Sequence, residues 1–387
     1  MSSSALIECK NNKSSEKFEV NEPFLRVSER IISELKGKTL EEAINLLVGR
    51  LKFNDLCSHR LKVTGVSPDY FNGIIDFGGT DTLVRVSEAL KEASISSVAE
   101  EIASRQSVKI VLIAGPSSSG KTTFCKKLSY ALGQQGIKSQ CLSLDDYYLP
   151  QDLVPVDEYG EKDFETIHSL DIPLFQQQLS ALLCGEEVEV PRYEFANGRA
   201  AKGTMVRLEA DSVLLIEGIH GLNPMLLHSG ENGIMLDDAK FFKIYISALT
   251  LQPVIDNDAE RREYNVNVYP STDNRLLRRI VRDSQFRGTS ARDTISRWGS
   301  VRRGEEKWIV PFQQFADANI NSAYQYEVSL LKTMALPILY NVKEDEAEYA
   351  TAQRLISLCN FYHEMPIDVL PPYSLLREFL GGSGYVY

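Results

Sequence analysis

The sequence lacks the cysteine and histidine spacings that build disulfide frameworks and structural zinc sites. Its 387 residues include six cysteines and five histidines, but no cysteine pair is spaced CxxC and no histidine pair HxxH or HxxxH. Disulfide-rich secreted domains and small zinc modules depend on such spacings. We therefore expect free thiols in a reducing compartment, and the sequence predicts a cytoplasmic protein.

Long apolar runs are missing as well. A membrane helix needs about 18 or more apolar residues in a row, whereas the longest candidates, Val108–Ala114 and Ser212–Ile216, have the length of a strand. The first 22 residues carry four glutamates, no arginine and no apolar signal core. Secretory signals and mitochondrial transit peptides have the opposite composition. We expect no membrane partner, and residues 1–20 are interpreted as a flexible polar tail.

Positive charge is scarce in most of the chain and concentrated in one segment. The chain has 42 Lys+Arg and 53 Asp+Glu, a formal net charge of -11. Residues 275–303 contain nine arginines and two acids, a local charge of +7 that leaves -18 for the other residues. A protein that coats nucleic acid needs a broad basic face. The sequence therefore disfavours a nucleic-acid partner and favours one compact, highly charged anionic ligand.

Alternating strand and helix patterns begin after residue 105. Short apolar runs at 108–114, 140–144, 211–216 and 241–246 predict strands, and residues 123–134 predict a helix. Continuous β-branched runs of this length are typical of parallel sheets buried on both faces. The pattern predicts an α/β, three-layer fold with a mainly parallel sheet. Upstream, residues 21–105 predict a small α+β region, with helices at Leu40–Leu51 and Thr82–Ile102.

A phosphate-binding loop follows the first of these strands. Residues 115–122 fit the pattern GxxxxGKT, between a strand and a helix. Backbone N–H groups of such a loop surround phosphates, the lysine reaches the β- and γ-phosphates, and the threonine hydroxyl ligates Mg²⁺. The predicted cofactors are ATP and Mg²⁺. The predicted ATP-binding residues of the loop are Gly115, Pro116, Ser117, Ser118, Ser119, Gly120, Lys121, Thr122 and Thr123.

Carboxylates follow two further predicted strands. Asp145 and Asp146 come after the second strand, and Glu217 ends the third. Ligands of a parallel α/β sheet bind outside the carboxyl ends of its strands. A phosphotransferase needs one carboxylate to accept the acceptor's proton and another to hold Mg²⁺. We predict Asp145 as the base, Thr122, Glu217 and Asp145 as metal residues, and Asp146 as a helix cap or supporting residue.

The arginine segment predicts a helix and a loop that form a lid over about residues 275–305. Arg275, Arg278, Arg279 and Arg282 share one helix face, and Arg287 follows in a loop before Gly288. Charge runs on a helix are usually solvated and paired with acids one turn away. Two acids cannot neutralise nine arginines, so we expect some of them to face phosphate.

These motifs, in this order, resemble the uridine kinase/phosphoribulokinase group of P-loop kinases, and within it a bacterial-type uridine kinase-like branch. The resemblance covers about residues 106–342. It rests on GPSSSGKTT, SLDDYY, DFETIHSLD (163–171), PRYEF (191–195), LLIEGIHGLNP (214–224), TDNRLLRRIVRDSQFRG (272–288) and FADANINSA (315–323). It implies a P-loop kinase domain over 106–345, followed by a C-terminal extension over 346–387.

The resemblance also implies roles for individual residues. Asp145 would activate the 5'-hydroxyl of a nucleoside, and Glu217 would serve Mg²⁺. The catalytic set is then Asp145, Lys121, Arg279 and Arg282, and Arg287 joins the ATP-binding residues. Substrate-binding residues would be Tyr148, Glu165, Tyr193, Phe195 and Arg279, of which Tyr193 and Phe195 frame the base. Related kinases are often oligomers, so a homo-oligomer is expected.

Three positions depart from the family pattern. Glu165 stands where uridine kinases have the aspartate that binds ribose, and the base-reading histidine and glutamine fall near Gly198 and Arg297. The most favoured function is a kinase for uridine or cytidine. A kinase for another small sugar-like or polyol acceptor stays open, as does a regulatory protein that binds ATP without catalysis.

Overall fold

The computed structural model describes residues 5–11, 14–20, 68–194, 197–228, 236–250, 252–255, 266–269 and 271–386. The chain divides into two compact units, each assembled from three stretches of sequence. Unit 1 comprises Met1–Lys91, Leu249–Leu277 and Ala323–Pro371, and unit 2 comprises Glu92–Ala248, Arg278–Ser322 and Pro372–Tyr387. The domain boundaries predicted after residues 20, 105 and 345 stay a prediction.

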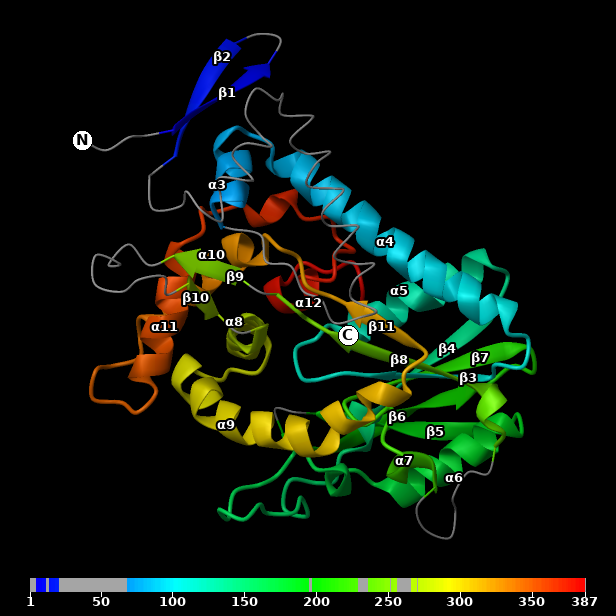
Figure 1. Cartoon of the computed structure of the whole chain (residues 1–387). Helices are drawn as coiled ribbons and strands as arrows, with labels where there is room; N and C mark the ends of the chain where they lie inside the picture. Colours follow the sequence, from blue (N-terminus) through cyan, green and yellow to red (C-terminus); the bar gives the residue numbers. More distant parts are fainter. Residues whose placement is uncertain are drawn as a thin grey trace. The chain divides into compact units, whose positions relative to one another are not determined.

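A parallel sheet forms the centre of unit 2 (Figure 1). In the described part of the chain it has five strands in the order β11-β8-β3-β7-β4, and every neighbouring pair is parallel. The predicted mainly parallel sheet is therefore confirmed; β11 was not predicted. The strands are β3 (Ile110–Ala114), β4 (Lys138–Ser143), β7 (Ser212–Glu217), β8 (Phe241–Ser247) and β11 (Ala318–Asn321).

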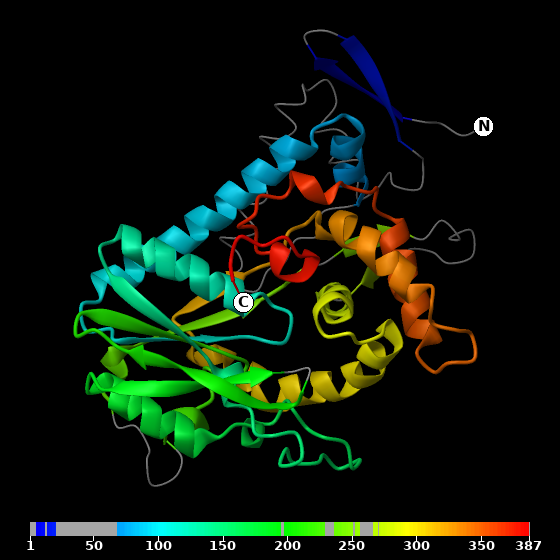
Figure 2. The ribbon, with the colours of Figure 1, turned by 180° about the vertical axis from the view of Figure 1, so that it is seen from behind.

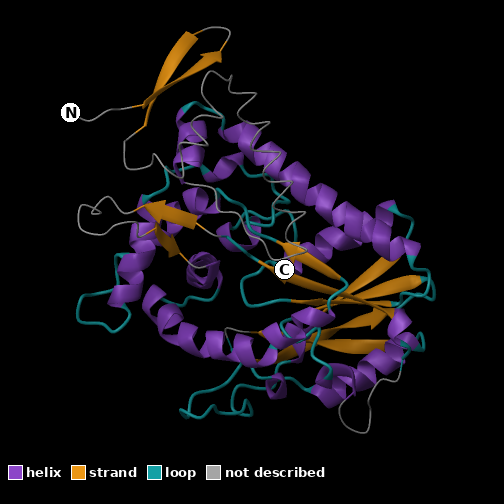
Figure 3. Ribbon diagram, viewed as in Figure 1, coloured by secondary structure: helices purple, strands orange, loops and turns teal. Residues whose placement is uncertain are grey.

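Apolar side chains of the sheet belong to two separate cores. Leu112 of β3 packs in one core with α6 (Ile172–Leu183), whereas its neighbour Val111 packs in another with α5 (Lys121–Gln134) and the end of α4 (Thr80–Ser104). Figure 3 shows helices on both sides of the strands. β3, which is buried at every position, is a continuous apolar run, as is typical of a strand covered on both faces. The predicted three-layer α/β fold is confirmed.

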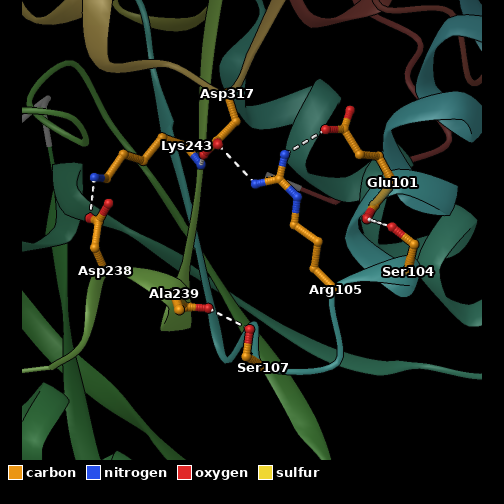
Figure 4. Close-up of polar contacts among 8 residues, drawn as sticks. All are labelled: Glu101, Ser104, Arg105, Ser107, Asp238, Ala239, Lys243 and Asp317. Carbon is orange, nitrogen blue, oxygen red and sulfur yellow. Dashed lines mark hydrogen bonds and ion pairs between the residues drawn. The ribbon is translucent and has the colours of Figure 1, made fainter.

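Surface ion pairs hold the amino ends of the strands together (Figure 4). Arg105, just after α4, donates to Asp317 Oδ1 at 2.8 Å, directly before β11. Asp317 Oδ2 accepts the backbone N–H of Lys243 in β8 at 2.8 Å. Ser107 Oγ, before β3, donates to the carbonyl oxygen of Ala239, before β8, at 2.7 Å. These contacts fix the amino edge of the sheet, away from the strand ends where ligands of such sheets bind.

Shorter elements of unit 2 follow the strands or lie beside them. β5 and β6 form an antiparallel hairpin, and the helix predicted from the arginine spacing is confirmed as α8. Residues 278–286 of α8 belong to unit 2. The elements are η2 (Leu144–Tyr147), β5 (Glu187–Glu194), β6 (Arg199–Arg207), α7 (Met225–His228), α8 (Ser271–Phe286), α9 (Ala291–Trp308) and α12 (Arg377–Leu380).

Unit 1 contains helices and two antiparallel hairpins. Its elements are β1 (Ala5–Asn11), β2 (Ser14–Val20), α3 (Pro68–Asp76), β9 (Gln252–Ile255), β10 (Val266–Tyr269), α10 (Glu327–Leu339) and α11 (Tyr349–Asn360). The predicted helix at 82–102 is confirmed as α4, two residues longer at each end. The helix predicted at Leu40–Leu51 lies outside the described residues. None of the helices in the described stretches is long and apolar enough to cross a bilayer.

The flexible polar tail predicted for residues 1–20 is wrong for most of that stretch. Residues 5–11 and 14–20 pair as β1 and β2 in an antiparallel register that joins Ile7 to Phe18. In β2 the apolar Phe18 and Val20 alternate with the charged Lys17 and Glu19. Such alternation is typical of a strand, and the polar average of the segment hides it.

Candidate active site

The loop after β3 depends on glycine at two positions. Gly120 adopts a left-handed φ of 83°, which glycine reaches without strain, and Ser118 has a φ of 59°. A Cβ on Gly115 would lie 1.9 Å from the carbonyl oxygen of Ile246 in β8. Helix α5 begins at Lys121, directly after the loop. The predicted phosphate loop therefore lies at the carboxyl end of β3 and leads into a helix N-terminus, an arrangement that binds anions.

Two arginines of α8 contact this loop. Arg279 Nη1 donates to Ser117 Oγ at 2.8 Å, and Arg278 Nη1 donates to the carbonyl oxygen of Ser118 at 3.3 Å. Arg278 is fully buried. Lys121 Nζ donates to a carbonyl oxygen of the loop at 3.2 Å. The structure thus brings the predicted Arg279 and Lys121 to one loop, and it adds Arg278 as a buried support.

Glu217, the last residue of β7, joins the phosphate loop to β4. Its Oε1 accepts the hydroxyl of Thr122 at 3.1 Å and that of Ser143 at 2.8 Å. Burial, with a smaller contribution from the charge of Asp145, raises the pKa of Glu217 to about 7. Thr122, Glu217 and Asp145, the predicted metal residues, are therefore close neighbours. Ser143 was not predicted, although its place at the end of β4 is the signal for it.

The adjacent Asp145 and Asp146 have different surroundings in η2. Asp146 Oδ1 accepts the backbone N–H of Tyr193 in β5 at 3.1 Å, and burial raises the pKa of Asp146. The backbone N–H of Asp145 donates to Ser143 Oγ at 3.4 Å. The side chain of Asp146 thus holds the β5–β6 hairpin. The charge of Asp145 acts on Glu217 and on the nearby Glu165.

Glu165 is a buried acid next to α9. Burial raises its pKa to about 7, although nearby Arg279 opposes the rise. A Cβ on Gly304 of α9 would lie 2.2 Å from Glu165 Cβ, so α9 approaches Glu165 through a glycine. Gly304 was not predicted. A lone glycine inside a helical pattern often has such a packing reason, and this is the signal that could have found it.

Two of the three predicted aromatic residues lie together. The rings of Tyr148 and Tyr193 have centroids 5.7 Å apart. The Tyr148 hydroxyl donates to the carbonyl oxygen of Phe164 at 3.1 Å, and burial raises the pKa of Tyr148. Phe195 lies outside the described residues. Tyr148 and Tyr193 thus form an aromatic surface near the end of β5, three residues along the chain from the predicted base in the case of Tyr148.

Asp283 pairs with three arginines, two in α8 and one directly after it. Within the described residues, Arg282 Nε donates to its Oδ1 at 2.9 Å, Arg279 Nε lies 3.4 Å from its Oδ2, and Arg287 Nε lies 3.7 Å from its Oδ1. Burial opposes ionisation of Asp283, but the three arginines lower its pKa. Burial and the charge of Arg282 lower the pKa of Arg287 to about 10. One carboxylate among three guanidiniums leaves positive charge that an anionic ligand would neutralise.

Two arginines of α9, Arg302 and Arg303, pair with acids. Arg302 donates to Glu305 at 2.6 Å and to Glu306 at 3.0 Å. Arg303 donates to Asp157 at 3.5 Å and lies over the ring of Tyr159, 4.7 Å from its centroid. The end of α8, where three arginines surround one carboxylate, therefore differs from this part of α9 by its local surplus of positive charge. That residues 275–305 form a mobile lid stays a prediction.

The donor set at this edge of the sheet fits a nucleoside triphosphate and Mg²⁺. The loop offers backbone N–H groups at the start of α5, and the hydroxyl of Thr122 and the carboxylate of Glu217 are hydrogen-bonded to each other. Mg²⁺ takes such oxygens together with phosphate oxygens and water. Among the described residues, no group of three or more His, Cys, Asp or Glu side chains could hold a metal ion.

The part of the chain that carries these residues is similar to known proteins. A sequence profile of the phosphoribulokinase/uridine kinase family matches residues 110–229, which include Lys121, Asp145, Glu165 and Glu217. The uridine kinase of Macrococcus caseolyticus (strain JCSC5402) is 31% identical over 209 residues, which cover 54% of this chain and 85% of that protein. The uridine kinase of Staphylococcus haemolyticus (strain JCSC1435) is 29% identical over 222 residues, 57% of this chain and 91% of that protein.

Among solved structures, D-glycerate 3-kinase from Cryptococcus neoformans var. grubii matches with a TM-score of 0.30 and 13% identity, over 74% of this chain and 87% of that chain. The sequence relatives decide the assignment, because the match to the Macrococcus protein extends over most of that protein. The chain belongs to the phosphoribulokinase/uridine kinase family and is a phosphotransferase with an alcohol group as acceptor.

Proposed function

We propose that the protein transfers the γ-phosphoryl group of ATP to the 5'-hydroxyl of uridine or cytidine. The observation that supports this best is the carboxylate of Glu217, hydrogen-bonded to Thr122 of the phosphate loop and to Ser143, two residues before Asp145. Phosphoryl transfer needs a phosphate loop, a cation ligand and a base within reach of one another. The similarity to uridine kinases supports a nucleoside as the acceptor.

ATP would bind along the loop and the start of α5. Backbone N–H groups of residues 115–123 would surround the phosphates, and Lys121 would reach the β- and γ-phosphates. Arg287, beside Asp283, would add charge at the outer end of the site. Mg²⁺, held by Thr122 and Glu217 with Asp145 nearby, would offset the negative charge of the β- and γ-phosphate oxygens.

Asp145 is the proposed base for the transfer. Its carboxylate would accept the proton of the acceptor hydroxyl while the hydroxyl oxygen forms a bond to the γ-phosphorus. The bond from this phosphorus to the bridging oxygen breaks, and ADP leaves with that oxygen. Lys121, Arg279 and Arg282 would stabilise the charge on the transferred group, since fixed cations do this without reorganisation. The ion pairs of Arg279 and Arg282 with Asp283 hold these guanidiniums in place.

The acceptor would lie between Glu165 and the aromatic surface. Tyr148, Tyr193 and Phe195 would pack on the base, and Glu165 would accept hydrogen bonds from the ribose hydroxyls. The pKa of Glu165 is raised to about 7 by burial. Ionised Glu165 binds a diol more strongly than the protonated form, because hydrogen bonds to a charged acceptor are stronger. Acceptor binding should therefore improve as pH rises through this value.

A different small acceptor is favoured by one observation. Gly198 stands near the position where uridine kinases place a histidine that reads the base, and it has a left-handed φ of 62°. A Cβ on Gly198 would lie 2.5 Å from Gln151 Oε1, so Gln151 packs directly against it. A pocket without the histidine suits a sugar-like or polyol acceptor as well as a pyrimidine.

An acceptor screen tests the proposal. Purified protein with Mg²⁺ and ATP would be incubated with nucleosides, sugars and polyols while ADP release is measured. Stimulation by uridine or cytidine is the expected result, and stimulation by non-nucleosides alone would establish the second function. If no alcohol raises ADP release above the rate without acceptor, the kinase proposal fails and an ATP-binding regulatory protein becomes the better account.

A further inference from the structure

The C-terminal segment of the chain, residues 372–386, lies against the phosphate loop within unit 2. It contains the short helix α12, which Figure 2 shows in red close to the start of α5. The sequence offers no motif for this segment, which follows the region that resembles kinases. Leu376 and Phe379 are nonetheless fully buried. Burial of this kind indicates that the segment is part of the folded unit.

Glu378 makes the central contact of this segment. Its Oε2 accepts the backbone N–H of Thr123 at 3.2 Å and the hydroxyl of Thr123 at 2.6 Å. Thr123 is in the first turn of α5, where backbone N–H groups have no partner within the helix. In a phosphate loop, N–H groups at this place hold the α- and β-phosphates of a nucleotide. The carboxylate of Glu378 thus bonds donors that a phosphate would use.

Further contacts hold the segment in this position. A Cβ on Gly120 would lie 2.6 Å from Leu375 Cδ2, so this leucine touches the backbone of the loop. Gln285 Nε2 of α8 donates to the carbonyl oxygen of Phe379 at 2.8 Å. The guanidinium of Arg278 lies 5.0 Å from the centroid of the Phe379 ring. The same arginine bonds the loop, so the segment and the loop share one buried support.

We propose that the C-terminal segment is an internal competitor of the nucleotide, with the carboxylate of Glu378 occupying donors that the phosphates of ATP or ADP require. This inference rests on the proposed binding of ATP at the loop. A carboxylate and a phosphate are both anionic, and one turn of helix cannot bond both through the same N–H. Nucleotide binding must therefore move Glu378 away from Thr123, and the segment makes nucleotide affinity weaker than the loop alone would give.

The size of the effect follows from the fraction of molecules with Glu378 released. The apparent dissociation constant equals the intrinsic constant divided by that fraction. Hydrogen bonds to a charged group stabilise the state in which Glu378 is bound to Thr123. They are strong enough that the fraction of molecules with Glu378 released is about one tenth or less. Removal of the carboxylate should therefore tighten nucleotide binding about tenfold or more.

Calorimetric titration with Mg²⁺ and ADP tests this in the full-length protein. The variants are Glu378→Ala and Glu378→Gln, with Glu186→Ala as the control because Glu186 is an exposed acid of the same unit. We expect the dissociation constant to fall about tenfold in Glu378→Ala, to fall less in Glu378→Gln, and to stay unchanged in the control. An unchanged or higher constant in both Glu378 variants would overturn the inference. The amide of Glu378→Gln preserves side-chain shape, so one variant should keep the native fold.

Hydrogen exchange in the wild-type protein gives a second readout. Backbone amides of residues 374–380 should exchange slowly without nucleotide and faster when ADP saturates the site. Exchange that stays the same or slows would mean that the segment keeps its place or closes over the nucleotide, and this overturns the inference.

The two proposals fail in different ways. If folded wild-type and Glu378→Ala proteins both bind no ADP, the proposed ATP site is wrong, and the inference falls with it. If the wild-type protein binds ADP and phosphorylates an acceptor, but the Glu378 variants bind ADP with wild-type affinity, the inference alone is wrong.

Discussion

The two edges of the central sheet hold charged residues in opposite ways. At the amino edge, Arg105 and Asp317 form an ion pair whose side chains are 39% and 29% exposed. At the carboxyl edge, Glu217 is 4% exposed, and burial raises its pKa to about 7. Solvated ion pairs contribute little to stability and need no ligand. Buried acids with raised pKa values occur where a site is prepared for catalysis or for a charged ligand.

The difference between the edges assigns separate tasks to them. Contacts at the amino edge join β8 to the chain before β11 and before β3, and they include a partly exposed ion pair. At the carboxyl edge, Glu217 and Glu165 are kept partly protonated near neutral pH, while the arginines around Asp283 carry surplus positive charge. A cation and a polyphosphate bound between them would stabilise both groups. Variants at the carboxyl edge should therefore affect catalysis, and variants at the amino edge should affect only stability.

A large effect is expected from Glu217→Gln. The amide can still accept the hydroxyls of Thr122 and Ser143, but it lacks the charge that would bind Mg²⁺ in the proposed site. We expect kcat/KM to fall by about 100-fold to 1,000-fold, the range seen when one charge-stabilising group is removed. Steady-state kinetics at several Mg²⁺ concentrations measure this. Glu186→Gln, at an exposed position, is the control, and a Glu217→Gln variant with the activity of this control would remove Glu217 from the site.

Arg279 and Arg303 offer a comparison within the arginine segment. Arg279 contacts the phosphate loop through Ser117, whereas Arg303 pairs with Asp157 and its side chain is 50% exposed. Arg279→Met should lower kcat/KM about 100-fold, and Arg303→Met should change it less than about twofold. Steady-state kinetics of both variants, with the acceptor that gives the highest activity in the acceptor screen, measure these changes in kcat/KM. Equal losses in the two variants would mean that the segment acts as a whole and that its position on α8 or α9 is irrelevant.

The raised pKa of Glu217 predicts a pH dependence of stability in the absence of ligand. Its pKa is about 7 in the folded protein against 4.5 as the ordinary value, so the folded state binds the proton more tightly than the unfolded state. The free energy of unfolding should therefore fall as pH rises between these values, by on the order of 3 kcal/mol from this group alone. Urea unfolding of wild-type and Glu217→Gln proteins across this range measures it. Parallel pH curves for the two proteins would show that the pKa of Glu217 is not raised.

The smallest effect is expected at the amino edge. Asp317→Asn weakens the contact with Arg105 and with the backbone N–H of Lys243. Each such hydrogen bond is worth about 1 kcal/mol, so Tm should fall by a few degrees while kcat and KM stay at wild-type values. Calorimetry and kinetics on the same sample measure both. A clear loss of activity would mean that the two edges do not have separate tasks.

Local sequence patterns predicted the parts of the site that follow strands or share a helix face. Lys121 follows the loop after β3, Asp145 lies two residues after β4 and Glu217 ends β7, so their positions relative to the strands could be predicted from the sequence. The arginine spacing placed Arg279 and Arg282 on one helix face, and the family resemblance implied their roles. The contact of Thr123 with Glu378 joins residues 255 positions apart. The periodicity of a sequence cannot predict such a contact, because the contact depends on how elements far apart in the chain pack together.

The same limit applies to charge balance and to close packing. Counting acids within residues 275–303 indicated surplus charge, but Arg303 pairs with Asp157, which lies far outside that segment. Gly304 against Glu165 is likewise a contact between distant parts of unit 2. The prediction of a flexible tail at residues 1–20 failed for another reason. It was based on the polar composition of the segment and not on the alternation of apolar and polar residues. The cytoplasmic location and the homo-oligomer stay predictions.

Two aspartate-to-asparagine variants, one at each edge of the sheet, test the central claim most directly. The claim is that the carboxyl edge performs catalysis and the amino edge does not. Asp145→Asn changes the proposed base, and Asp211→Asn changes an exposed aspartate directly before β7 at the amino edge. We predict that Asp145→Asn lowers kcat about 1,000-fold while ADP affinity changes less than about threefold, and that Asp211→Asn leaves both unchanged. An Asp145→Asn enzyme that retains wild-type kcat would contradict the account.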